Sequence, residues 1–147
     1  MISSAFQRDA NHVPIVSLGL TETKSITYVT ATTGATGATT LFTVTGTVAI
    51  RVFAICGTDL TGTNATLEVG IAGNTAAIIA QTTGAGIDAG EIWLDTTPGT
   101  VETLPALQII SGTDIIQTIA THTVDAGVLT YYCVWAPISY DGNVVVA

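Results

Sequence analysis

The sequence has very little positive charge. It contains 3 lysine and arginine residues against 11 aspartate and glutamate residues, so the formal net charge of the 147-residue chain is −8. Nucleic-acid binding needs a basic stripe that neutralises phosphates, and no such stripe is present. Charged residues make up only 10% of the chain and hydrophobic residues 48%. A disordered chain has the opposite balance, so we expect a folded, globular protein.

Cysteine is also scarce, and long apolar runs are lacking. Cys56 and Cys133 are too few and too far apart for a disulfide framework or a metal clip, so we expect two buried thiols. The run Thr47–Cys56 has about half of the ~20 residues that a helical membrane span needs, and Arg51 interrupts it. The N-terminal residues include charged and amide side chains where a signal peptide has an apolar core. The sequence therefore predicts a soluble protein made in the cytosol, without a membrane partner.

Residues with β-branched side chains are what the sequence has in excess. It contains 28 Thr, 16 Ile and 14 Val, which together are 58 of the 147 residues. Such side chains are stiff at χ1 and fit a pleated sheet better than a helix. About nine short segments have strand character, Gly-rich turns separate them, and none has a convincing helical period. This pattern predicts an all-β fold, an antiparallel β-sandwich or barrel, in a single domain.

Two strands are marked most clearly. Both faces of 47–56 are largely apolar, so this strand is expected at the centre of a sheet, between two layers. In 128–136, Leu129, Tyr131, Cys133 and Trp135 share one face. Other strands are expected at 24–32, 40–44, 65–71, 75–81, 91–95, 105–111, 114–120 and 141–147. Those at 65–71 and 75–81 should form a tight hairpin.

Residues 1–23 differ from the rest of the chain. They mix charged, amide and proline residues without a sustained period, although a short strand is possible near 13–18. We expect them to form an extended arm ahead of a sandwich domain at 24–147. Inside that domain, the Gly-rich stretches 33–39 and 82–90 have the composition of loops.

No group of residues forms a recognisable catalytic, metal or cofactor site. No serine lies in a nucleophile elbow, and no cysteine and histidine cluster has zinc-site spacing. The stretch 34–39 lacks the lysine of a phosphate-binding loop. Asp88, Glu91 and Asp95 lie close together but fit no calcium loop, so we expect solvated loop acids. The prediction is a protein that is not an enzyme, with no catalytic residue, no metal and no cofactor.

Arg51 is the most informative polar residue. It is the only charged residue in the segment 47–56. A cation in a central strand must pair with a carboxylate, reach toward an edge or face a partner. An internal ion pair is the first expectation, and a contact at an interface is the second.

Three runs of the sequence carry a family resemblance: VTGTVAIRVFAICGTDLTGTNATLEVGIAGNTAAIIAQTT, IDAGEIWLD and DAGVLTYYCVWAPISYDGNVVVA. Residues 44–147, which contain them, resemble head decoration (cement) proteins of tailed bacteriophages, whose folds are jelly-roll-like β-sandwiches. The resemblance implies a virion protein that binds assembled major capsid protein on the outer capsid surface and ties neighbouring capsomers together. It also implies assembly in the host cytoplasm, and it carries over no catalytic residue.

Under this interpretation, the arm and the Gly-rich loops should contact the capsid. An arm without a period can order against a partner, and glycine allows close approach of the backbone. The predicted partner-binding residues are Arg8, Lys24, Arg51, Gly34, Gly37, Gly84 and Gly86. A homodimer or homotrimer is also expected, because few charges hold the chains apart and symmetric oligomers are common.

Two other functions stay open at the level of the sequence. A carbohydrate-binding β-sandwich of a phage fibre or tail tip would stack sugars on a platform of aromatic rings, although core packing is the better expectation for most of them. Those rings belong to Trp93, Trp135, Tyr131, Tyr132 and Tyr140. A glycan hydrolase is the third interpretation.

Overall fold

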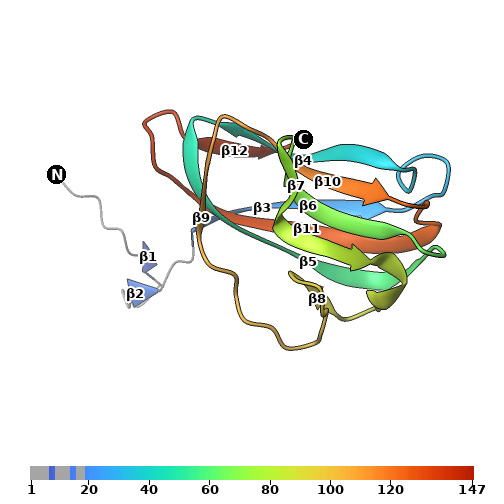
Figure 1. Cartoon of the computed structure of the whole chain (residues 1–147). Coiled ribbons are helices and arrows are strands. Elements are labelled where there is room, and N and C mark those ends of the chain that lie inside the picture. The colour runs from blue at the N-terminus through green and yellow to red at the C-terminus, as the bar shows by residue number, and fades with distance from the viewer. Residues whose placement is uncertain (1–6, 9–13, 16–18) are drawn as a thin grey trace.

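The chain forms two antiparallel β-sheets that pack face to face (Figure 1). The computed structural model describes residues 7–8, 14–15 and 19–147. The β4 sheet has the order β12 (Asn143–Val146), β4 (Gly37–Thr45), β10 (Ile115–Ala120), β6 (Thr66–Ile71) and β7 (Asn74–Thr83). The β5 sheet has the order β3 (Leu20–Thr27), β11 (Ala126–Pro137), β5 (Thr47–Thr61) and β8 (Ile92–Trp93), with β9 (Gln108–Ser111) also paired to β5. A separate pair joins β1 (Gln7–Arg8) to β2 (Pro14–Ile15).

The strand order is that of a jelly roll. The turn between β6 and β7 divides the chain, and strands on either side of it pair in succession: β6 with β7, β5 with β8 and β9, β4 with β10, and β3 with β11. These paired strands form one two-stranded ribbon, which curls back on itself. As a result β11 also pairs with β5, and β10 with β6, and these pairings are antiparallel. The predicted single antiparallel β-sandwich of jelly-roll type is therefore confirmed, with β12 as an additional edge strand.

Most of the predicted strands are present, but some of their ends differ. The hairpin of β6 and β7 is confirmed, and β5 continues beyond the predicted Cys56 to Thr61. The strand predicted to begin at Lys24 begins at Leu20, and residues 20–23 pair with 132–135 of β11. The predicted boundary of the arm at residue 23 thus falls inside β3. The polar and charged residues of this segment show no strand pattern in the sequence, and pairing with β11 keeps the segment extended.

The two Gly-rich stretches are only partly loops. Gly37–Thr39 already belongs to β4, where Gly37 pairs with Ile119 of β10. Strand β7 continues to Thr83 and is followed by one 3₁₀ turn at Gly84–Gly86. The loop prediction is wrong at these residues, because hydrogen bonding to neighbouring strands overrides a composition rich in Gly, Ala and Thr.

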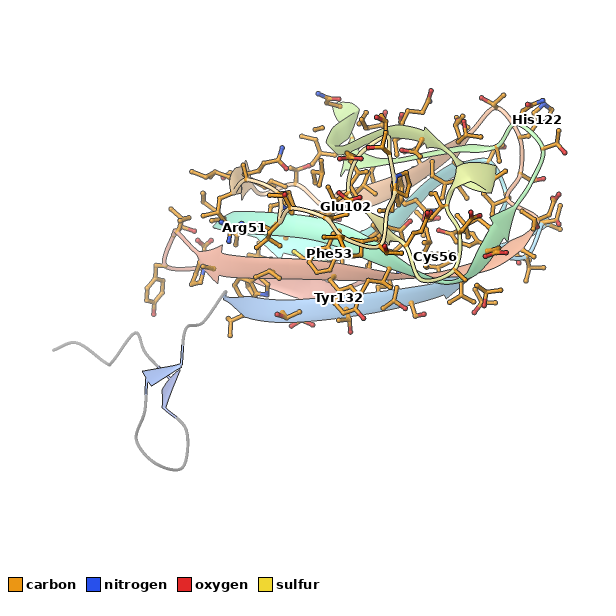
Figure 2. The ribbon with its side chains drawn as sticks, turned by 90° about the horizontal axis from the view of Figure 1, so that it is seen from below. Arg51, Phe53, Cys56, Glu102, His122 and Tyr132 are labelled. Carbon is orange, nitrogen blue, oxygen red and sulfur yellow. The ribbon has the colours of Figure 1, made fainter. Side chains whose placement is uncertain are left out.

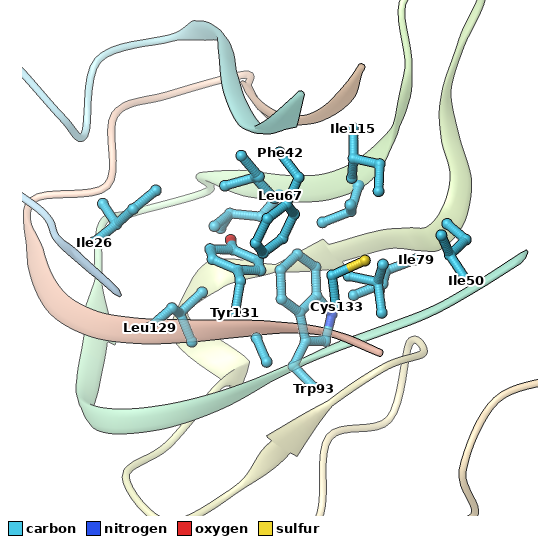
Figure 3. Close-up of a cluster of buried hydrophobic side chains, with 14 of the residues drawn as sticks. Ile26, Phe42, Ile50, Leu67, Ile79, Trp93, Ile115, Leu129, Tyr131 and Cys133 are labelled. Carbon is cyan, nitrogen blue, oxygen red and sulfur yellow. The ribbon is translucent and has the colours of Figure 1, made fainter. Parts of the chain in front are cut away.

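The core lies between the two sheets and takes its side chains from alternate positions of each strand (Figure 3). Leu129, Tyr131, Cys133 and Trp135 share one face of β11, as predicted, and all four are buried in the core. The two cysteines are buried and unpaired, which confirms the expected pair of thiols. The largest fully buried side chains are Trp93, Tyr131, Phe42, Leu41, Ile50, Leu67, Ile79, Ile87, Ile115, Ile119, Leu129 and Gln117. Burial of each large apolar side chain contributes about 1.5–3 kcal/mol to folding.

A small polar network crosses this core. The hydroxyl groups of Tyr28 (just after β3) and Tyr131 (β11) both donate to Oε1 of Gln117 in β10, so the network joins the two sheets. Gln117 Nε2 is buried without a hydrogen-bond partner. Burial raises the pKa of both tyrosines, so their hydroxyls stay protonated and keep donating at any ordinary pH.

Candidate functional site

The first place to look for a binding surface is the edges of the two sheets, because an unpaired strand edge accepts an additional strand. Edge strand β3 carries Glu22 and Lys24, both half-buried. The Lys24 ammonium donates to the carbonyl oxygens of Thr40 and Ala147, each at 2.9 Å, and so closes the gap between the two sheets on this side. Lys24 therefore has an internal role.

The other edges are short or irregular. Register shifts interrupt the pairing of β7 with β6, and irregular edges pair poorly with new strands. Gln108 Nε2 donates to the carbonyl oxygen of Ala77 at 2.8 Å, which occupies one acceptor of β7. Strands β8, β9 and β12 have only 2, 4 and 4 residues. Strand addition is therefore disfavoured at these edges, which leaves the outer edge of β3, a strand that in the described part of the chain pairs only with β11.

The two outer faces differ in character. On the β4 sheet, Thr43 and Thr45 are exposed, and Gln81 donates to Glu68 at 3.3 Å. On the β5 sheet, the outer positions are largely apolar, and Ala49 and Val134 are buried although they face away from the core. Part of this outer face is covered by a further layer, which lies against Arg51 and Phe53.

That layer is the segment 94–107 between β8 and β9, which we call the strap (Figure 1). Two backbone hydrogen bonds between Ile92 and Gly99 fix its beginning. Arg51 of β5 fixes its other end, because Nε donates to the carbonyl oxygen of Pro105 at 2.8 Å. Within the described residues no carboxylate pairs with Arg51. The internal ion pair expected for Arg51 is therefore wrong, because its internal partner is a backbone carbonyl and not a carboxylate.

Beneath the strap, the rings of Phe53 and Tyr132 are stacked with their centroids 5.2 Å apart and their planes at 12° (Figure 2). Phe53 also lines a pocket of about 150 Å³. The other walls of the pocket are Ile92 and Leu94 on one side and Glu102 and Leu104 of the strap on the other. The strap and Phe53 thus enclose a pocket beside the stacked rings.

Exposed apolar side chains continue this surface along the strap and β9. Leu104 is 39% exposed, Leu107 56%, Ile109 69% and Val101 88%. Ile109 pairs with Ala49 of β5 and so faces the same side as Arg51 and Phe53. The outer face of the β5 sheet together with the strap and β9 is called the strap face. Grouped apolar side chains of this kind mark an interaction surface.

The remaining predicted partner residues are divided between the interior and the surface. Gly34 and Gly84 are buried, and a Cβ on Gly34 would lie 1.8 Å from the carbonyl oxygen of Val124. Gly37 and Gly86 are exposed, with open space around them. The backbone of Arg8 pairs with Pro14, and its side chain lies outside the described part of the chain. Within the described residues, none of these four glycines lies next to Arg51. The sequence did not predict the strap, because no residue pattern in 94–107 indicates that this segment lies on the β5 sheet.

The acids of 88–95 serve local structure. Glu91 accepts a hydrogen bond from the backbone N–H of Asp88 at 2.9 Å, and Asp95 accepts two from Thr97. In the ranges that the structure describes, no three His, Cys, Asp or Glu side chains are grouped to hold a metal ion. No helix there is long and apolar enough to cross a membrane.

The aromatic platform considered for sugar binding does not form as a unit. Trp93, Trp135 and Tyr131 are buried in the core, where Trp93 and Tyr131 contact edge to face. Tyr132 is half-buried against Phe53, and only Tyr140 is fully exposed. Core packing, the better expectation for most of these rings, is confirmed for three of the five.

The fold and the strap face define a class: a jelly-roll β-sandwich with one apolar, partly covered outer face. Comparison with known proteins adds little to this. No family model matches the chain, and no curated protein matches it. A chain of the solved structure described as "Cyanophage Pam1 capsid asymmetric unit" is similar at a TM-score of 0.39 and 19% identity, over 92% of this chain and 98% of that chain. A TM-score of this size does not establish a shared fold.

Proposed function

We propose that the protein is a structural component of a tailed-phage virion, a decoration protein that binds assembled major capsid protein on the outer surface of the head. The observation that carries the proposal is the strap face, an apolar surface on one side of a jelly-roll sandwich. The resemblance of residues 44–147 to head decoration proteins supports it. In this role the protein needs no catalytic residue and no cofactor.

The electrostatics of the chain limit the kind of partner surface. The net charge is −8, and the two cations whose side chains the structure describes, Lys24 and Arg51, are hydrogen-bonded to backbone carbonyls. A strongly acidic partner would be repelled at short range. The capsid surface that receives the strap face is therefore expected to be apolar with basic or neutral surroundings.

Co-sedimentation with undecorated capsids tests the proposal. Ile109→Asp places a charge at the centre of the strap face, and we expect binding to weaken by about tenfold or more, because a buried unpaired charge is costly. Val145→Asp is the matched control, since Val145 is 46% exposed on the other sheet. No binding of the unchanged protein would contradict the proposed function, and equal binding of the two variants would show that the strap face does not make the contact.

The contact predicted for the N-terminal arm needs its own test, because most of the arm lies outside the described residues. Removal of residues 1–18 leaves β3 intact, since that strand begins at Leu20. If the arm makes most of the capsid contacts, the shortened protein loses occupancy while Ile109→Asp retains it. The opposite result assigns the contact to the strap face. A glycan array on the same samples checks the carbohydrate-binding alternative.

A further inference from the structure

The pocket beneath the strap combines features that are rarely found together on a structural protein. Of its five lining residues, three are aliphatic, one is the aromatic Phe53 and one is the acidic Glu102. Its volume of about 150 Å³ is roughly ten times the space that a single water molecule needs. The pocket can therefore receive a whole side chain.

Glu102 is half-buried at the wall of this pocket. Within the described residues, its carboxylate has no hydrogen-bond or ion-pair partner. Arg51 lies on the same face of β5, but its Nε donates to the carbonyl oxygen of Pro105, and it does not line the pocket. Most other acids near the strap have internal partners, as Asp95 does with Thr97. The carboxylate of Glu102 is thus available to a group that enters from outside.

We infer that this pocket receives an arginine side chain of the partner protein. The inference rests on the proposed function for the identity of that partner, but the pocket chemistry stands on its own. The methylene stem of an arginine packs on Ile92, Leu94 and Leu104, and its planar guanidinium stacks over the ring of Phe53. The same guanidinium donates two parallel hydrogen bonds to the carboxylate of Glu102.

Two opposing charge effects act on such a side chain. The positive charge of Arg51, two residues from Phe53 on the same face, repels it. The carboxylate of Glu102 attracts it from within the pocket wall, and the overall charge of −8 attracts it from a distance. Glu102 lines the pocket, whereas Arg51 does not and is hydrogen-bonded to Pro105. The attraction by Glu102 therefore acts over the shorter distance and exceeds the repulsion by Arg51.

The test uses the isolated full chain, labelled for NMR, and Nα-acetyl-arginine methylamide as the probe. The citrulline analogue is its neutral isostere, and Nα-acetyl-leucine methylamide is the purely apolar comparison. We expect saturable shifts at the pocket residues, with the arginine probe bound about tenfold more tightly than the citrulline probe, as a charge-assisted hydrogen bond requires. Glu102→Gln should remove this preference. Glu68→Gln, which removes the same charge from the other sheet, should leave it unchanged.

Several results would overturn the inference. They are equal binding of the arginine and citrulline probes, tighter binding of the leucine probe, the same preference in Glu102→Gln, and shifts spread over the whole surface. Its failure is distinguishable from failure of the proposed function. If the arginine preference is absent while Ile109→Asp still releases the protein from capsids, only the pocket assignment is wrong. If the preference is present while capsids do not bind, only the proposed partner is wrong.

Discussion

At the scale of single residues, Gly34 shows how a residue chosen for contact with a partner can have an internal role. Its carbonyl accepts the N–H of Val124 at 2.9 Å, and a Cβ would lie 1.8 Å from the carbonyl oxygen of that residue. We expect Gly34→Ala to lower the free energy of unfolding by about 3 kcal/mol, because backbone must move to relieve the clash. Urea denaturation followed by tryptophan fluorescence measures this change.

Gly86→Ala is the matched control for that substitution. Gly86 is exposed, and nothing lies within 4 Å of the position that its Cβ would occupy. Its substitution should change the free energy of unfolding by no more than about 0.5 kcal/mol. Similar costs at the two positions would show that the packing of the 28–36 turn on Val124 does not contribute to stability.

The buried thiol of Cys133 predicts how stability changes with pH. Burial raises the pKa of this thiol from its ordinary value of 9.0 to about 12 in the folded protein. The unfolded chain therefore releases a proton between about pH 9 and 12 that the folded chain retains. We expect the free energy of unfolding to be constant below about pH 8.5 and to fall above it, by up to about 1.4 kcal/mol per pH unit for this one group.

Cys133→Ala provides the control for the alkaline transition. Its intrinsic stability differs, so the slopes of free energy against pH are compared and not the absolute values. The slope between pH 9 and 10 should be shallower in the variant. The remainder comes from Cys56 and, toward pH 10, from Tyr28 and Tyr131, whose pKa values burial also raises. An unchanged slope, or a stability that stays constant up to pH 11, would contradict the prediction.

At the scale of elements, the sequence predicted the inward-facing side chains better than the ends of the strands. The alternation in β11 and β5 is strong enough to assign both faces, since a one-residue slip would expose the whole apolar set. Residues 20–23 at the start of β3 were missed because Glu22 resembles a surface residue. The internal role of Lys24 depends on β4, whose carbonyl at Thr40 accepts its hydrogen bond, and no local pattern contains that information.

The strap is the element with the most direct functional prediction. Arg51→Met retains the apolar stem of the side chain and removes the donor to Pro105. We expect amide hydrogens in 94–107 to exchange faster by about tenfold, because the lost charged hydrogen bond is worth about 1.5 kcal/mol. Exchange in β5 and β11 should stay unchanged. Hydrogen–deuterium exchange with mass spectrometry measures both regions.

Lys24→Met is the control for the strap experiment. It removes an equal charge and similar backbone bonds, but on the side of the sandwich away from the strap, at β3 and β4. Faster exchange should then appear in those strands and not in 94–107. If both variants loosen the strap equally, the effect comes from lost charge and the tether at Pro105 is unimportant.

At the scale of the whole molecule, composition predicted the class of fold but not the site. The abundance of β-branched residues and turns favoured a sandwich or barrel, and the jelly-roll order required pairings between strands that are far apart in the chain, such as β3 with β11. The strap face depends on the same long-range pairing. Leu107 and Ile109 become neighbours of Arg51 only because β9 returns to the edge of β5.

Association of the chain with itself, as a homodimer or homotrimer, stays a prediction, and its salt dependence follows from the charge. Apolar side chains on the strap face favour association. A net charge of −8 opposes it, and Lys24 and Arg51, the cations whose side chains the structure describes, are already hydrogen-bonded. Raising the ionic strength from about 0.01 to 0.5 M shortens the screening length severalfold and removes most of this repulsion. We therefore expect sedimentation equilibrium to show tighter self-association at high salt, and Ile109→Asp to weaken it while Val145→Asp does not. A 15.0 kDa monomer at both salt concentrations would contradict the prediction and would leave the strap face to a different partner.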